Sequence, residues 1–284
     1  MRQSTFKIPR VTVVYEEDSE SIILPRGVEY NLVDMLDSAT VNYAVTDERN
    51  EGKKIKVFFK GQLTDHQNEA FEELNRYRDG VLSGTTGFGK TVVGARLIAE
   101  KKCSTLILVH TKELAAQWKE RLEQFLQVDE VIEKRRRNNS IIGQLGGGKK
   151  TLNGVIDIAI MQSMFEQDKS VKPMINLYGL VIVDECHHIS ATNFSRILSA
   201  ADAKYVYGLT ATPIRKDGHH PIIFMHLGPI RYKVDAKQEA KKRDFEHFIV
   251  PRFTRTRMPL LKIMMNGTLQ KSISIFVKVV IETN

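Results

Sequence analysis

Residues 84–91 have the types and spacing of a phosphate-binding loop. The loop follows the pattern G-x-x-x-x-G-K-T and reads Gly84, Thr85, Thr86, Gly87, Phe88, Gly89, Lys90, Thr91. Glycines let backbone N–H groups point at phosphate oxygens, and a helix that starts behind them adds the positive end of its dipole. Lys90 can neutralise the β- and γ-phosphates, and the Thr91 hydroxyl can bind Mg²⁺. The whole stretch is therefore predicted to bind ATP with Mg²⁺, because a chance glycine-rich turn would not have an apolar run before it and helical spacing after it.

A pair of acidic residues ends a second apolar run. Residues 180–183 are apolar, and Asp184 and Glu185 follow them. Asp184 could hold Mg²⁺ through water opposite the phosphate loop, and Glu185 could polarise the water that attacks the γ-phosphate. Two acids at a strand end are common, but here they follow the phosphate loop by roughly ninety residues. We predict Lys90, Asp184 and Glu185 as catalytic residues and Thr91 and Asp184 as metal ligands.

Further polar residues are candidates for sensing the nucleotide. Gln67 precedes the loop at the start of a helical stretch, and its amide could read the adenine edge with a donor and an acceptor. A surface glutamine at a helix start is the commoner case. Thr210 and Thr212 could bond to the segment that runs from Asp184 to His187, and so couple the nucleotide state to a nucleic-acid groove. Hydroxyls that cap the following turn are the alternative.

Apolar runs carry most of these residues at their carboxyl ends and alternate with stretches of helical spacing. The runs are residues 79–83, 104–109, 155–160, 180–183 and 205–209. Alternation of this kind predicts an α/β fold, a doubly wound parallel sheet with helices on both faces that binds ligands along its carboxyl edge.

Charge and composition restrict the partners. The formal net charge is +8 with a sequence pI near 9.3, which favours a polyanion. The basic run 133–139 and the glycine-rich run 141–150 could lie close to a phosphate chain, although a solvated loop is the alternative. Cys103 and Cys186 have neither a metal-binding nor a disulfide spacing. No apolar run approaches the ~18 residues of a membrane span, and no secretory core is present, so we expect a cytoplasmic location and no membrane partner.

Three of these stretches resemble known helicase motifs. Residues 84–91, 184–187 and 210–212 resemble motifs I, II and III of superfamily 2 helicases of the DEAH-like branch. The stretch 208–218 is similar to xeroderma pigmentosum B-type repair helicases and to restriction-type translocases. The resemblance implies a RecA-like domain and ATP-driven movement on, or remodelling of, DNA or RNA, with DNA favoured. Cys186 stands where the family usually has alanine.

Two more stretches resemble motifs that lie against the sugar-phosphate backbone in the family. Residues 109–114, with Gln117 and Trp118, resemble motif Ia, and residues 160–163 resemble a further contacting motif. The nucleic-acid contacts that this resemblance implies are His110, Thr111, Lys112, Gln162 and Ser163.

The chain is predicted to have three parts. Residues 1–60 form a small α+β appendage, residues 61–232 the RecA-like domain, and residues 233–284 a linker and the truncated start of a second domain. In the family two RecA-like domains enclose ATP, and residues 228–232 look like the crossing toward the second. We therefore expect a second RecA-like domain, in cis or in trans, as a partner. The alternative is a nucleic-acid- or partner-binding module that holds nucleotide with little hydrolysis.

Overall fold

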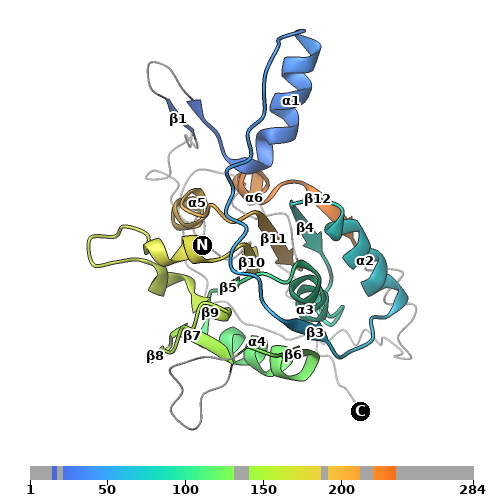
Figure 1. The fold of residues 1–284 in the computed structure, drawn as a ribbon, viewed down its shortest axis with the longest axis vertical. Helices are drawn as coiled ribbons and strands as arrows, with labels where there is room; N and C mark the ends of the chain where they lie inside the picture. Colours follow the sequence, from blue (N-terminus) through green and yellow to red (C-terminus); the bar gives the residue numbers. More distant parts are fainter. Residues whose placement is uncertain (1–14, 18–21, 131–140, 187–190, 212–219, 235–284) are drawn as a thin grey trace, which may run out of the picture. The chain divides into compact units, whose positions relative to one another are not determined.

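The computed structural model describes most of the first 234 residues. The described residues are 15–17, 22–130, 141–186, 191–211 and 220–234 (Figure 1). By its contacts the chain divides into two units, Met1–Ala236 and Lys237–Asn284, and every described residue belongs to the first unit.

An eight-stranded sheet is the centre of this unit. Its strand order is β12-β4-β11-β10-β5-β9-β7-β8, and all neighbours are parallel except β7 and β8. The strands are β4 (Asp79–Ser83), β5 (Thr105–Val109), β7 (Ile142–Gly146), β8 (Lys149–Lys150), β9 (Ile156–Ile160), β10 (Leu180–Asp184), β11 (Tyr205–Thr210) and β12 (Ile230–Lys233). The predicted doubly wound α/β sheet is confirmed, with one short antiparallel strand at its edge.

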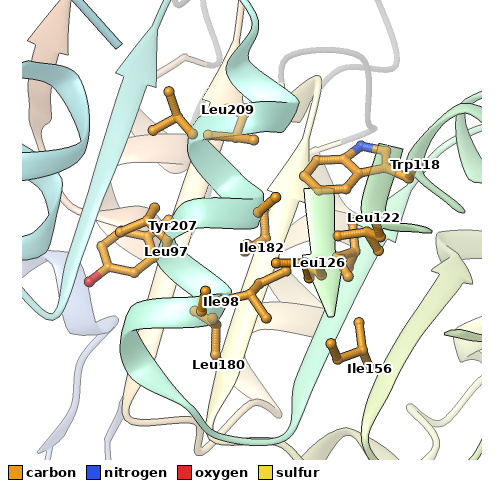
Figure 2. Close-up of a cluster of buried hydrophobic side chains, with 14 of the residues drawn as sticks. Leu97, Ile98, Trp118, Leu122, Leu126, Ile156, Leu180, Ile182, Tyr207 and Leu209 are labelled. Atoms are coloured by element: carbon orange, nitrogen blue, oxygen red, sulfur yellow. The ribbon is translucent and has the colours of Figure 1, made fainter. Parts of the chain in front are cut away.

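Helices cover both faces of the sheet. Successive side chains of a strand point to opposite sides, so the apolar central strands offer an apolar surface on each face. On one face, Leu82, Ile182 and Leu209 pack with α2 (Asp65–Asn75), α3 (Lys90–Lys101) and α4 (Lys112–Phe125). Figure 2 shows Ile182 and Leu209 of this cluster with Leu97 of α3 and Trp118 of α4. On the other face, Val81 and Val183 pack with α5 (Ala191–Ser199) and α6 (His220–Leu227), together with residues of the short helices η2 (Met161–Met164) and η3 (Pro173–Leu177). Each face of the central strands is therefore buried.

Two parts of the sheet differ from the sequence-based expectation. Residues 141–150 form the β7–β8 hairpin, in which β7 pairs with β9 inside the sheet. Residues 228–232, expected to cross toward a second domain, lead into β12, which pairs with β4. Neither strand has the continuous apolar run that marks a buried parallel strand. β7 is buried but includes the polar Gln144, and β12 is only half-buried at the edge of the sheet.

The residues before the phosphate loop form small elements of their own. These are β1 (Glu16–Glu17), β2 (Ile22–Ile23), η1 (Arg26–Val28), α1 (Glu29–Ser38) and β3 (Val57–Phe59), which pairs antiparallel with β6 (Leu126–Val128). The acidic residues Glu16 and Glu17 form β1, which pairs antiparallel with β2.

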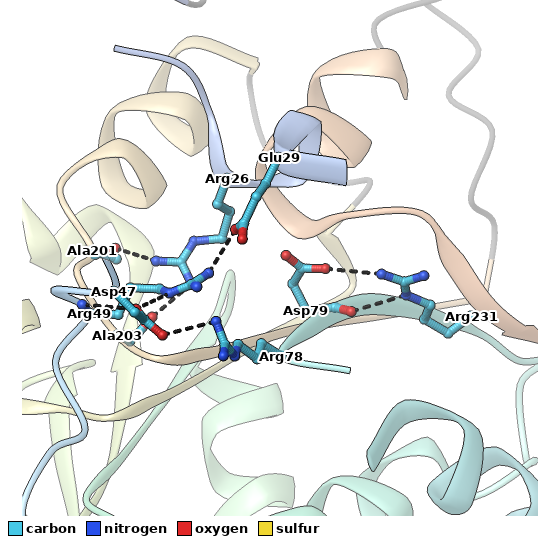
Figure 3. Close-up of polar contacts among 9 residues, drawn as sticks. All are labelled: Arg26, Glu29, Asp47, Arg49, Arg78, Asp79, Ala201, Ala203 and Arg231. Carbon is cyan, nitrogen blue, oxygen red and sulfur yellow. Dashed lines mark hydrogen bonds and ion pairs between the residues drawn. The ribbon is translucent and has the colours of Figure 1, made fainter. Parts of the chain in front are cut away.

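Arginines attach the N-terminal elements to the amino end of the sheet (Figure 3). The Arg26 guanidinium donates to the carbonyls of Ala203 and Ala201, just before β11, at 2.7 and 2.8 Å. In the same region Arg231 of β12 pairs with the buried Asp79 at the start of β4. The contacts divide the chain after Ala236, and the domain boundaries at residues 60 and 232 stay predictions.

Within the described residues, every helix is too short or too polar to cross a membrane.

Candidate functional site

The phosphate-loop pattern lies between β4 and α3, at the carboxyl edge of the sheet. β4 is buried along its length and ends at Ser83, and α3 begins at Lys90. Gly89 caps the helix with φ 89° and ψ 33°, a left-handed conformation that glycine adopts without strain. The Gly84 N–H donates to the Thr210 carbonyl at 2.9 Å, which ties the loop to β11. The positive end of the α3 dipole therefore lies at the loop, where a phosphate would be stabilised.

The Gln67 amide braces this loop from α2. Its Nε2 donates to the Phe88 carbonyl at 2.8 Å, and its Oε1 accepts the Thr64 N–H at 3.1 Å within a capping box. A Cβ at Gly89 would lie 2.5 Å from Gln67 Nε2, so only glycine leaves room for this contact. One N–H and one lone pair of the amide remain for a ligand. The adenine contact of Gln67 stays a prediction, and the bracing contact had no signal in the sequence.

Lys90 connects the phosphate loop to the acidic pair. Its side chain is about 10% exposed, and its Nζ donates to the Gly84 carbonyl at 3.0 Å. The same Nζ lies 3.8 Å from Glu185 Oε1. The fold therefore brings together two residues that the sequence analysis placed in one catalytic set.

Asp184 and Glu185 lie in different environments although they are neighbours. Asp184 ends β10 and is buried, and burial raises the pKa of its carboxyl, an effect that the hydrogen bond from Trp118 and the charge of Lys90 oppose. Glu185 is more exposed and has φ 48°, a left-handed conformation that costs a non-glycine residue on the order of 1 kcal/mol. Its Oε2 accepts the Ala211 N–H at 3.5 Å. The turn at Glu185 directs a carboxylate toward Lys90.

The residues predicted to hold Mg²⁺ offer suitable donor atoms. Thr91 supplies a hydroxyl and Asp184 a carboxylate, the hard oxygen ligands that Mg²⁺ prefers. Mg²⁺ usually takes only one or two protein carboxylates and completes its shell with water and phosphate oxygens. The Thr85 hydroxyl oxygen is buried without a hydrogen-bond partner among the described residues, and a phosphate oxygen would provide one. The donor set fits a metal–nucleotide complex.

The predicted coupling residues are described only in part. Thr210 ends β11, is fully buried, and its hydroxyl hydrogen-bonds to the Cys186 thiol. Burial raises the pKa of that thiol to about 12, so Cys186 stays neutral. His187 and Thr212 lie outside the described residues.

The five predicted nucleic-acid residues lie at the carboxyl ends of β5 and β9. Thr111 caps α4, since its hydroxyl accepts the Leu114 N–H at 3.2 Å, and Lys112 is exposed in the first turn. His110 directly precedes this cap. Gln162 is exposed and Ser163 half-buried in η2, which follows β9. The N-terminus of α4 and the exposed Lys112 lie together at the carboxyl edge of the sheet, and both favour the binding of a phosphate group.

The β7–β8 hairpin turn lies between these two groups. A Cβ at Gly147 would lie 3.3 Å from Lys112 Cβ, and one at Gly146 would lie 2.5 Å from Ser163 Oγ. The exposed Lys149 and Lys150 follow in β8. The basic run 133–139 lies outside the described residues.

Trp118 is a site residue that the sequence analysis did not assign. Its Nε1–H donates to Asp184 Oδ2 at 2.7 Å, and its side chain is buried in the core between α3 and α4. Its place beside the predicted motif Ia was noted, but helical spacing alone does not distinguish a core tryptophan from one that binds an active-site carboxylate.

A parallel sheet of this order, with a phosphate loop after β4 and an acidic pair after β10, defines a P-loop NTPase domain of the RecA-like type. The family model described as "Type III restriction enzyme, res subunit" matches residues 60–215, more than half of the chain, and the chain belongs to this family.

Relatives extend this assignment to superfamily 2 helicases, as the motifs predicted. The DNA 3'-5' translocase XPB2 of Sulfurisphaera tokodaii is 33% identical over 183 residues, which are 64% of this chain and 38% of that protein. The DNA 3'-5' helicase XPB of Mycobacterium tuberculosis is 33% identical over 66% of this chain and 33% of its own length. The putative helicase 109L of Invertebrate iridescent virus 3 is 30% identical over 72% of this chain and 63% of its own length. The chain thus spans less than two thirds of each.

The fold is shared with a solved helicase structure. The UvsW helicase from Bacteriophage T4 superposes with a TM-score of 0.54 at 19% identity, over 76% of this chain and 81% of that chain. At this identity the likeness concerns the fold, and it agrees with the RecA-like sheet described above.

Proposed function

We propose that this chain carries the ATP-binding motor domain of a nucleic-acid-dependent ATPase that moves on or remodels DNA. The observation that carries the proposal is the 3.8 Å between Lys90 Nζ and Glu185 Oε1. At this distance the phosphate loop and the acidic pair lie together at one edge of the sheet, where a triphosphate can be bound and attacked by water.

Each residue of this edge has a distinct part in hydrolysis. The Lys90 ammonium, which now donates to the Gly84 carbonyl, would gain a charged acceptor in the triphosphate. Mg²⁺ held by Thr91 and Asp184 would supply positive charge to the β- and γ-phosphate oxygens. Glu185 would accept a proton from a water whose oxygen attacks the γ-phosphorus, while the bond to the ADP oxygen breaks. Among these groups Glu185 is suited to be the base, because its carboxylate is more exposed than that of the buried Asp184.

Several observations support DNA as the polymer that binds here. The chain is basic. The candidate DNA contacts Lys112 and Ser163 both lie beside the hairpin turn between β7 and β8, at the carboxyl edge of the sheet. Backbone N–H groups and lysines of this kind bind phosphates without reading sequence. Two of the relatives are named a DNA translocase and a DNA helicase, which favours DNA over RNA.

A second RecA-like domain, in cis or in trans, would complete the site. An arginine finger that such a domain supplies is worth about 10³–10⁵ in turnover in related phosphoryl-transfer sites. Without such a domain, the site described here should bind nucleotide and hydrolyse it slowly.

The test is ATP binding and steady-state ATP hydrolysis by the 284-residue chain, with and without single-stranded DNA. We expect Mg²⁺-dependent ATP binding, slow turnover and slight stimulation by DNA, with turnover at least about tenfold faster once a second RecA-like domain is fused after Ala236. An absence of nucleotide binding would overturn the proposal. Nucleotide binding without hydrolysis in either form would favour a nucleic-acid- or partner-binding module instead.

A further inference from the structure

Trp118 joins the helix after β5 to the acidic pair. It lies in the middle of α4, its side chain is about 1% exposed, and its Nε1–H donates to Asp184 Oδ2 at 2.7 Å. In Figure 2 its ring nitrogen lies on the side away from Leu122, while the ring packs among the apolar side chains of the core. The indole therefore has one edge in the core and one on the carboxylate.

The position of the ring is fixed from the other side by α3. A Cβ at Gly94 would lie 2.8 Å from Trp118 Cη2, so the indole contacts the backbone of α3 directly. Gly94 is one helical turn after Lys90 of the phosphate loop. Trp118 thus contacts both the phosphate-loop helix and the acidic pair.

The Asp184 carboxylate has a donor on each oxygen. Trp118 donates to Oδ2, and the Glu185 backbone N–H donates to Oδ1 at 3.0 Å. Each oxygen keeps a further lone pair for a ligand. Hydrogen bonds to both oxygens fix the plane of the carboxylate, and donors of this kind orient and tune the ligands of a metal.

A purely structural role would explain burial and a satisfied N–H, because buried tryptophans usually find an acceptor. It would not explain why that acceptor is the buried acid at the end of β10. Tyr207, in the same core cluster, shows the ordinary case: its hydroxyl donates at 2.6 Å to a backbone carbonyl, that of Tyr77.

We propose that Trp118 is a positioning residue, which holds the Asp184 carboxylate in the orientation needed to bind Mg²⁺ together with the nucleotide. This inference rests on the proposed function, since it assigns Asp184 to the metal. The indole N–H orients the carboxylate, and the packing of the indole ring fixes the position of that N–H.

The first test is Mg²⁺ titration of the binding of a fluorescent ATP analogue. Trp118→Phe keeps an aromatic ring and removes the donor, and we expect it to raise the Mg²⁺ concentration at half-saturation about tenfold, the lower end of what such supporting hydrogen bonds contribute. Tyr207→Phe is the matched control, because it also removes one hydrogen bond from a buried aromatic residue, and it should leave the Mg²⁺ dependence unchanged. Nucleotide binding that is lost equally in both variants would overturn the positioning role.

A double variant separates positioning from general loosening of the core. When Trp118→Phe is added to Asp184→Asn, the Mg²⁺ concentration at half-saturation should not rise further. The contact between the Asp184 carboxylate and Mg²⁺, which the indole is proposed to support, is already altered in Asp184→Asn. An additive loss would overturn the inference, since Trp118 would then act independently of Asp184.

The unaltered chain offers a third measurement, because Trp118 is its only tryptophan. Mg²⁺ with ATP should change the intrinsic fluorescence of Trp118, and Asp184→Asn should abolish the part of the change that depends on Mg²⁺. If the parent chain binds no Mg²⁺–nucleotide at all, the proposed function fails. If it binds and Trp118→Phe binds with the same Mg²⁺ dependence, only the present inference fails.

Discussion

Replacing Arg231 by methionine should destabilise the fold, because it leaves a buried carboxylate without its cation. Asp79 is about 2% exposed, and Arg231, with 13% of its side chain exposed, donates to its carboxylate at 3.4 Å and to its carbonyl at 3.2 Å (Figure 3). Removing one partner of a buried ion pair costs about 3–5 kcal/mol. Since Arg231 is partly exposed, we expect about 3 kcal/mol, which is a fall of roughly 6–12 °C in Tm.

The loss should depend on pH. Burial raises the pKa of Asp79 above its usual value of 3.8, and Arg231 opposes that rise. A carboxyl whose pKa is higher in the folded state contributes less stability as pH rises through that value. In Arg231→Met the pKa rises further, so the destabilisation should be largest near neutral pH and shrink as pH falls toward 4.

The control is Arg78→Met, in which an exposed arginine loses its pairing with Asp47 at 2.9 Å. Exposed pairs contribute about 0–1 kcal/mol, so this variant should unfold almost as the parent does. The assay is urea unfolding at pH 5 and pH 8. Equal stability of the two variants, or a loss in Arg231→Met that does not change with pH, would refute the account of the amino end of the sheet.

Three further variants test the site. Lys90→Ala should weaken binding of a fluorescent ATP analogue about 10- to 100-fold, since it removes a charge-assisted bond of about 1.5–3 kcal/mol, and unchanged affinity would remove Lys90 from the phosphate site. Gly89→Ala should weaken nucleotide binding because its Cβ meets the Gln67 amide, whereas Gly148→Ala, with φ 82° and open space around it, should cost comparable stability and leave that affinity intact. Lys112→Ala should reduce the slope of log K for single-stranded DNA binding against log salt concentration by about 1. The control is Lys54→Ala, at an exposed lysine on the amino edge of the sheet, which should leave this slope unchanged. Equal slopes for the two variants would exclude DNA binding at the carboxyl edge.

The sequence predicts the centre of the sheet well because those strands are apolar on both faces. Residues 106–109 and 180–183 are continuous apolar runs, and they lie side by side in β5 and β10. β7 is harder to predict, since Gln144 is buried within it and its neighbour β9 buries Asp157. Asp157 is tolerated there because its carboxylate accepts hydrogen bonds from the Tyr178 hydroxyl and from backbone N–H groups.

The residue types of the site are predictable, but some of its contacts are not. The phosphate-loop pattern and the acidic pair are local in sequence, and the fold brings Lys90 next to Glu185 as that pattern requires. The hydrogen bond from Trp118 to Asp184 joins residues 66 positions apart, and no periodic pattern in the sequence indicates it. The bond from Gln67 to Phe88 is of the same kind. Long-range polar contacts of this sort depend on tertiary packing and become visible only in the structure.

The most direct test of the proposed motor site is single-turnover ATP hydrolysis by the parent chain and by Glu185→Gln, with the protein in excess over ATP. The amide keeps the shape of the side chain and cannot accept the proton of the attacking water. We expect Glu185→Gln to bind Mg²⁺ and ATP as tightly as the parent and to release phosphate about 10²–10⁴-fold more slowly. Hydrolysis by the variant at the rate of the parent would contradict the assignment of Glu185 as the general base.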